Sequence, residues 1–146
     1  MIEIIRSPYG KIVDKIAKPI DLSMLPLYGE KEILNLSVGR YGKVKIKLEV
    51  ESDLHALNVV NEYKERYKEN KNYHTYQWEV EENKLPKQYE YLIRSEMTRF
   101  IEIFSVLNKD PHVFRFSIVD GGFRDLERPV HAQAVREAII ELFNQI

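Results

Sequence analysis

Residues 43–51 read KVKIKLEVE, an unbroken alternation of charged and aliphatic side chains. Because successive side chains of a β-strand point to opposite faces of the sheet, this alternation predicts a strand. Val44, Ile46 and Leu48 would pack on a core while the lysines face water, which is typical of a sheet with one buried face. The stretch therefore predicts a layered fold in which helices cover one side of a sheet.

Further strands are expected on both sides of this stretch. Residues 33–38 precede it across the turn at 39–42, so these two strands should form a hairpin. An earlier hairpin is expected from residues 2–6 and 11–16, because the sequence between them contains Pro8 and Gly10, which favour a turn. The apolar residues at 17–30 should wrap irregularly around the edge of the core. Later strands are expected at 73–81 and 113–119.

Three segments have the apolar periodicity of helices. The first follows Ser52, a favourable N-cap, and runs to about residue 70. It should bury one stripe of side chains, formed by Ala56, Val60, Tyr63 and Tyr67. The second is opened by Pro86 and ends near residue 108, ahead of Pro111. The third runs to the C-terminus, with Pro129 in its first turn.

This order of elements predicts an α+β fold with two layers. We expect a mixed or mainly antiparallel sheet of about five or six strands, with one face covered by about two or three helices. The 146 residues should form a single domain spanning 1–146. Connections of helix length permit parallel or antiparallel neighbours, so the strand order stays open.

Composition limits the classes of function. The formal net charge of -1 argues against general binding to nucleic acid or to an anionic membrane. The chain has no cysteine, which excludes disulfides and thiolate chemistry and fits a reducing compartment. No apolar run reaches the length of a signal peptide or a membrane span, so we expect a soluble cytoplasmic protein.

The segment that follows the strand at 113–119 is the first candidate site. Two glycines should let the backbone approach a ligand closely, and the next helix should begin nearby with free N–H groups. Two arginines and a histidine would favour a small anion. The candidate ligand-binding residues are Asp120, Gly121, Gly122, Arg124, Arg128 and His131. An ordinary turn with surface ion pairs is the simpler interpretation.

Evidence for catalysis is weak. Asp120 as general base with His131 as acid is the one enzyme hypothesis that the sequence suggests, and a turn role for the aspartate is simpler. The other histidines, His55, His74 and His112, have no spacing typical of a metal site. We therefore expect no metal and no cofactor, and a non-catalytic protein is favoured.

The solvated sheet face is the second candidate site. If the apolar side of each strand meets the helices, the polar side chains of the strands lie together on the outer face of the sheet. This outer face could bind a protein. The candidate partner-binding residues are Lys43, Lys45, Lys47, Gln77 and Arg115, with Tyr41 and Tyr73 as possible anchors. The simpler interpretation is a hydrated face that keeps the protein in solution.

These observations favour a small cytoplasmic protein-interaction domain without catalytic activity, similar in size and makeup to adaptor or immunity proteins. The alternative is a domain or enzyme for a small anionic ligand, which would use Gly121, Gly122 and the start of the following helix.

Overall fold

The computed structural model describes residues 2–67, 72–125 and 127–146. Its five-stranded sheet is mixed, as expected. Strands β1 (Leu27–Asn35) and β2 (Arg40–Val50) are antiparallel, and β2 is antiparallel to β4 (Phe114–Gly122). Strand β3 (Thr75–Trp78) pairs parallel to β4 at one edge of the sheet, and the short β5 (Arg128–Pro129) pairs parallel to β2.

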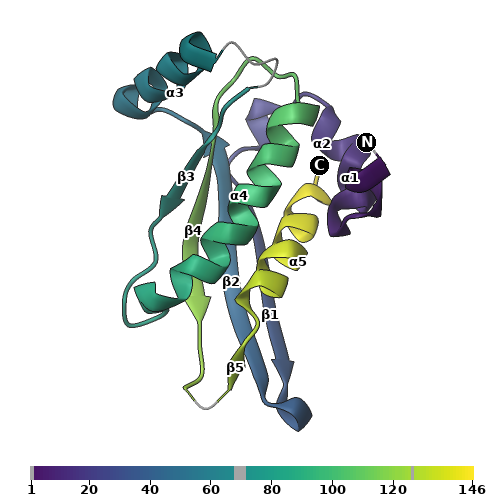
Figure 1. Ribbon diagram of the computed structural model, residues 1–146, viewed down its shortest axis with the longest axis vertical. Coiled ribbons are helices and arrows are strands. Elements are labelled where there is room, and N and C mark those ends of the chain that lie inside the picture. Colours follow the sequence, from purple (N-terminus) through teal and green to yellow (C-terminus); the bar gives the residue numbers. More distant parts are fainter. Residues whose placement is uncertain (1, 68–71, 126) are drawn as a thin grey trace.

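Helices form the second layer. Helices α4 (Glu90–Leu107) and α5 (His131–Phe143) lie across one face of the sheet (Figure 1). The N-terminal segment contains α1 (Ile2–Arg6) and α2 (Val13–Ala17), and α3 (Leu54–Tyr67) lies apart at one end of the sheet. Short 3-10 segments are η1 (Pro8–Ile12), η2 (Leu22–Met24), η3 (Leu36–Val38) and η4 (Lys87–Tyr89). The predicted two-layer α+β sandwich is confirmed.

The alternation of residues 43–51 has the predicted structural effect. β2 lies inside the sheet between β1 and β4. Val44, Ile46 and Leu48 are fully buried, whereas Lys45 and Lys47 on the other side are partly exposed. The aliphatic side therefore contributes to the core, and the lysine side is part of a face that α4 and α5 do not cover. We call this second side of the sheet the open face.

Phenylalanine rings fill the space between the sheet and its helices. Phe100 and Phe104 of α4 meet Phe116 of β4 and Phe143 of α5, with ring centroids 5.4 to 5.9 Å apart. Phe104 and Phe116 meet edge to face at 80°. Such pairs contribute about 0.5–1.5 kcal/mol beyond the burial of their area. The apolar stripe of α4 predicted from its periodicity thus forms the centre of the core.

Helix α5 approaches β1 closely because Gly29 has no side chain. A Cβ at Gly29 would lie 2.1 Å from the carbonyl oxygen of Ala138, a distance that no real Cβ tolerates. The glycine therefore sets the separation between the helix and this strand.

The predicted N-terminal hairpin is wrong, because residues 2–6 and 8–17 form helical turns. The Ser7 hydroxyl accepts a hydrogen bond from Tyr9 N at 3.2 Å, and Pro8 occupies the first turn, which is an N-cap arrangement. Tyr9, Ile12 and Ile16 are fully buried. Their spacing of three and four residues puts them on one helical face.

Three further expectations are corrected. β1 begins at Leu27, inside the segment expected to be irregular. β4 continues through Gly121 and Gly122, which were expected to lie beyond the strand. Pro129 belongs to β5 and not to the first turn of α5. The expected helix end near residue 70 and the loop residue Leu126 lie outside the described residues.

The stripe expected to bury α3 is only partly buried. Val60 is 5% exposed, but Tyr63 is 49% exposed and Tyr67 is 51% exposed. Helix α3 therefore does not share the core with α4 and α5. Along the described ranges, no helix combines the length and apolarity needed to cross a membrane.

Candidate binding pocket beside the open face

Strand pairing places the predicted partner-binding residues on one surface. Lys47 pairs with Ser117 of β4, which pairs with Gln77 of β3, and Arg115 lies two positions before Ser117. Lys43 and Lys45 share the side of Lys47 because side chains of a strand alternate. The structure thus brings Lys43, Lys45, Lys47, Gln77 and Arg115 together on the open face.

The lysines of the open face have neighbours of their own. Lys43 Nζ lies 3.4 Å from Glu30 Oε1, and Lys47 Nζ lies 2.7 Å from Glu49 Oε2. The ammonium of Lys45 lies 5.0 Å from the centroid of the Tyr28 ring. Exposed pairs of this kind contribute little to stability, so these side chains can exchange their neighbours for those of a partner.

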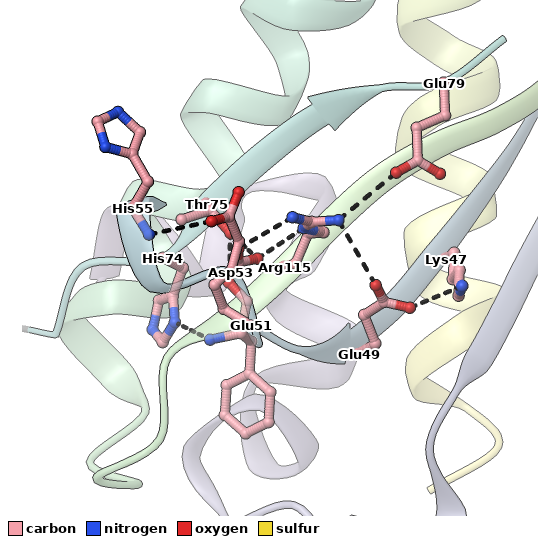
Figure 2. A network of polar contacts seen from close by, with 10 residues as sticks. Lys47, Glu49, Glu51, Asp53, His55, His74, Thr75, Glu79 and Arg115 are labelled. Atoms are coloured by element: carbon pink, nitrogen blue, oxygen red, sulfur yellow. Dashed lines mark hydrogen bonds and ion pairs between the residues drawn. The ribbon is translucent and has the colours of Figure 1, made fainter. Parts of the chain in front are cut away.

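Arg115 is the centre of a polar network that begins on the open face (Figure 2). Its Nε donates to Glu51 Oε2 at 2.6 Å and its Nη2 donates to Glu51 Oε1 at 3.0 Å, while Thr75 Oγ1 donates to Glu51 Oε2 at 2.9 Å. Arg115 Nη1 lies 3.6 Å from a Glu79 oxygen and 3.9 Å from a Glu49 oxygen. The hydrogen bonds to Glu51 raise the pKa of Arg115. The guanidinium is therefore charged and surrounded by carboxylates.

A pocket of about 420 Å³ lies where α3 meets this network. We call it the α3 pocket. Its apolar wall comes from α3, and its polar side comes from the segment between β2 and α3, from the residues just before β3, and from strands β3 and β4. The α3 side chains are Ala56, Val59, Val60 and Tyr63, and the remaining lining residues are Glu51, Asp53, Tyr73, His74, Thr75, Tyr76, Gln77 and Arg115.

Tyrosines form one side of the α3 pocket. The rings of Tyr63 and Tyr73 have centroids 5.9 Å apart, and Tyr67 lies 5.5 Å from Tyr63 along the helix. Tyr73, an anchor predicted from the sequence, thus lines a pocket. Tyr41, the other predicted anchor, is only 7% exposed and lies under Arg124, so the prediction of an exposed anchor there is wrong.

His74 is held in one orientation at the pocket wall. Its Nδ1 accepts a hydrogen bond from Phe114 N at 3.0 Å, so the ring proton resides on Nε2. That Nε2 is buried and has no hydrogen-bond partner among the described residues. Burial and the nearby Lys64 charge lower the pKa of His74 to about 4. His74 is therefore neutral at physiological pH.

The first candidate site, the segment that follows residues 113–119, differs from the α3 pocket because its groups already contact other parts of the protein. Gly121 is buried in β4, and a Cβ there would lie 2.6 Å from Leu85 Cδ2. The guanidinium of Arg124 lies 4.8 Å from the centroid of the Tyr41 ring, and Arg128 N donates to Gly39 O at 2.6 Å. The backbone approach expected at Gly121 is therefore taken by a leucine.

The remaining groups of this predicted site also have protein partners. Asp120 Oδ1 accepts from Gly121 N at 2.9 Å and lies 3.8 Å from Lys84 Nζ. His131 is 1% exposed, and its Nε2 donates to Gly122 O at 2.8 Å. Burial lowers the pKa of His131, which disfavours the protonated form that an acid catalyst would need. The acid–base pair and the anion site stay predictions. Within the described residues, no three histidine, aspartate or glutamate side chains are grouped as metal ligands would be.

Comparisons with known proteins add little to this site. No protein-family model matches the chain, and no curated protein is significantly similar in sequence. The chain is similar to a solved structure from Thermus thermophilus, with 14% identity and a TM-score of 0.47. The match covers 81% of this chain and only 14% of that one. A similarity of this size establishes neither a family nor a function. The structure itself defines an α+β sandwich with a pocket beside its open face.

Proposed function

We propose that the protein is a small, non-catalytic cytoplasmic domain that binds a protein partner through the open face and the α3 pocket. The observation that carries this proposal is the exposed apolar surface of α3 beside the pocket. Along one face of α3, the exposed fractions of the side chains are 40% for Val59, 49% for Tyr63 and 51% for Tyr67. The cytoplasmic location rests on the cysteine-free composition.

An exposed apolar group of this kind is typical of an interaction surface. Single exposed apolar residues are common, whereas contiguous ones that border a recess mark binding sites. Interfaces concentrate their binding energy in a few aromatic or arginine anchors that fill pockets, with a polar rim around them. The α3 pocket would receive such an anchor, and the side chains of Lys45, Lys47 and Gln77 would form part of the polar rim.

A protein partner fits this surface better than a small molecule does. The exposed apolar side chains Val59, Tyr63 and Tyr67 share one face of α3 at four-residue spacing, and Tyr67 extends this face beyond the lining of the pocket. A ligand confined to the pocket would leave the Tyr67 side chain in water, whereas a polypeptide lying along α3 and the open face would cover both.

Site-specific photo-crosslinking tests the proposal. A photoreactive amino acid is introduced at Gln77, which is exposed and lines the pocket, or at Tyr91, which is 69% exposed on α4. We expect Gln77 to crosslink a discrete protein in cells of the natural host and Tyr91 to give no such product. The same adducts from both positions, or none from Gln77, would contradict the proposal.

Charge reversal tests the rim separately. The pair Lys45→Glu and Lys47→Glu should reduce the yield of the Gln77 crosslink about tenfold or more, because rim charges set association and orientation. The matched pair Lys11→Glu and Lys18→Glu changes the net charge equally on the N-terminal segment and should leave the yield unchanged. Equal yields from both pairs would remove the lysines from the interface.

A further inference from the structure

The residues that line the α3 pocket carry more negative than positive charge, with Lys64 as a further cation near His74, and the pocket has aromatic and apolar walls. Its lining contains two carboxylates, Glu51 and Asp53, and one guanidinium, Arg115. Glu49 and Glu79 also approach Arg115, so several carboxylates offset its charge. His74 contributes no charge at physiological pH because its pKa is lowered to about 4. An incoming anion would meet an arginine that is already paired, whereas an incoming cation would meet the carboxylate of Asp53, whose Oδ1 accepts a hydrogen bond from His55 N at 3.0 Å as the N-cap of α3.

The tyrosine rings of the pocket also favour a cation over an anion. An aromatic ring presents a negative face that attracts ammonium and guanidinium groups. Tyr63 and Tyr73 supply two neighbouring rings, tilted by 50°, in the pocket lining. Ala56, Val59 and Val60 add aliphatic surface on which the methylene stem of a long basic side chain would lie.

We infer that the α3 pocket binds a basic side chain, with arginine preferred, from an extended segment of the protein partner. The inference rests on the proposed function and specifies the chemistry of the anchor. The stem would contact Ala56 and Val59, and the charged group would lie between the tyrosine rings and Asp53. Arginine is preferred to lysine because its planar guanidinium stacks on aromatic faces and is more weakly hydrated.

Three blocked tripeptides test the pocket without knowledge of the partner. They are acetyl-Gly-Xaa-Gly-amide with arginine, norleucine or glutamate at Xaa, added to the full-length ¹⁵N-labelled protein and followed by NMR. We expect saturable shifts at Ala56, Val60 and Gln77 with the arginine peptide. Binding should be about threefold or more tighter than for norleucine, and the glutamate peptide should not saturate.

Two variants separate the contributions of ring and charge. Tyr63→Leu keeps an apolar side chain but removes the ring, and Asp53→Asn removes only the charge because asparagine also caps helices well. Each should weaken binding of the arginine peptide by about threefold or more, and Asp53→Asn should leave the norleucine peptide unaffected. Tyr91→Leu, on the exposed side of α4, is the matched control and should change nothing.

The outcomes distinguish this inference from the proposed function. Equal or tighter binding of norleucine would show a purely apolar pocket and overturn the preference for a cation. Shifts that do not saturate, or that map away from α3, would overturn the pocket as a binding site. If either result occurs while Gln77 still crosslinks a partner, the basic anchor is wrong and the interaction surface stands.

Discussion

Arg115 and Glu51, 64 positions apart in the sequence, form a doubly hydrogen-bonded ion pair whose carboxylate is completely buried. The pair joins the end of β2 to the start of β4 and closes one side of the α3 pocket. A carboxylate removed from water needs both its cation and its other hydrogen bonds, because the desolvation cost is otherwise not offset. Thr75 supplies a third hydrogen bond. The pocket wall is therefore fixed in place before any ligand arrives.

Breaking this pair should be costly for stability. Arg115→Met leaves the buried Glu51 carboxylate without its cation, and we expect the free energy of unfolding to fall by about 3 kcal/mol. Lys47→Met, which breaks the partly exposed pair with Glu49, should cost about 0.5 kcal/mol. The double variant Arg115→Met with Glu51→Met should recover much of the loss, because neither charge remains. Urea denaturation of the four proteins measures this; similar small losses in both single variants would contradict it.

His74 should make stability depend on pH in the acidic range. Burial and then Lys64 depress its pKa from 6.5 to about 4 in the folded protein. Between pH 4 and pH 6.5, His74 is protonated in the unfolded chain and neutral in the folded protein. Stability is therefore fully present above pH 6.5 and is lost as the pH falls toward 4, by roughly 3 kcal/mol in total.

His74→Asn isolates this effect, because the asparagine Oδ1 can replace Nδ1 as the acceptor for Phe114 N while the side chain no longer titrates. The variant should flatten the dependence of unfolding free energy on pH between 4 and 6.5. Some slope should remain, since burial also lowers the pKa of His131. An unchanged slope in urea titrations would contradict the assignment.

The sequence contains enough information for the sheet and much of the helix layer. The alternation at 43–51 identifies a strand with one wet side, and the periodicity of 89–107 identifies α4. The N-terminal helices were missed because short apolar segments fit either period. Only their packing shows that Tyr9, Ile12 and Ile16 share a helical face.

The α3 pocket could not be predicted in the same way. The periodicity of α3 shows that it has an apolar stripe, but not which side of the sheet the stripe meets or how much of it stays exposed. The pocket combines residues of α3, β3 and β4 with residues of the segments that precede α3 and β3, and their meeting depends on the order β1-β2-β4-β3, which the sequence left open. Strand register alone nevertheless placed Arg115 and Gln77 on the outer face, and Tyr73 was a possible anchor because tyrosine is enriched in interfaces.

The two adjacent glycines of β4 should respond differently to substitution. A Cβ at Gly121 would lie 2.6 Å from Leu85 Cδ2 and 3.0 Å from Lys43 O, whereas at Gly122 the nearest atom is Tyr41 Oη at 3.2 Å. Gly121→Ala should therefore destabilise the protein by about 2 kcal/mol, as overpacking does. Gly122→Ala should cost less than about 1 kcal/mol. Thermal or urea unfolding of both variants measures this difference; equal costs would show that Leu85 yields without penalty.

The hypothesis of an anion site at Gly121, Gly122, Arg124 and Arg128 can be tested by its effect on the melting temperature. A ligand that binds only the folded state raises the melting temperature, and Arg124→Ala or Arg128→Ala would abolish that rise. We expect inorganic phosphate to give no rise that depends on either arginine. Arg124 would have to leave the Tyr41 ring, and Gly122 O already accepts a hydrogen bond from His131. A phosphate-dependent increase that both alanine variants remove would instead establish this segment as the ligand site, and the function would have to be assigned there.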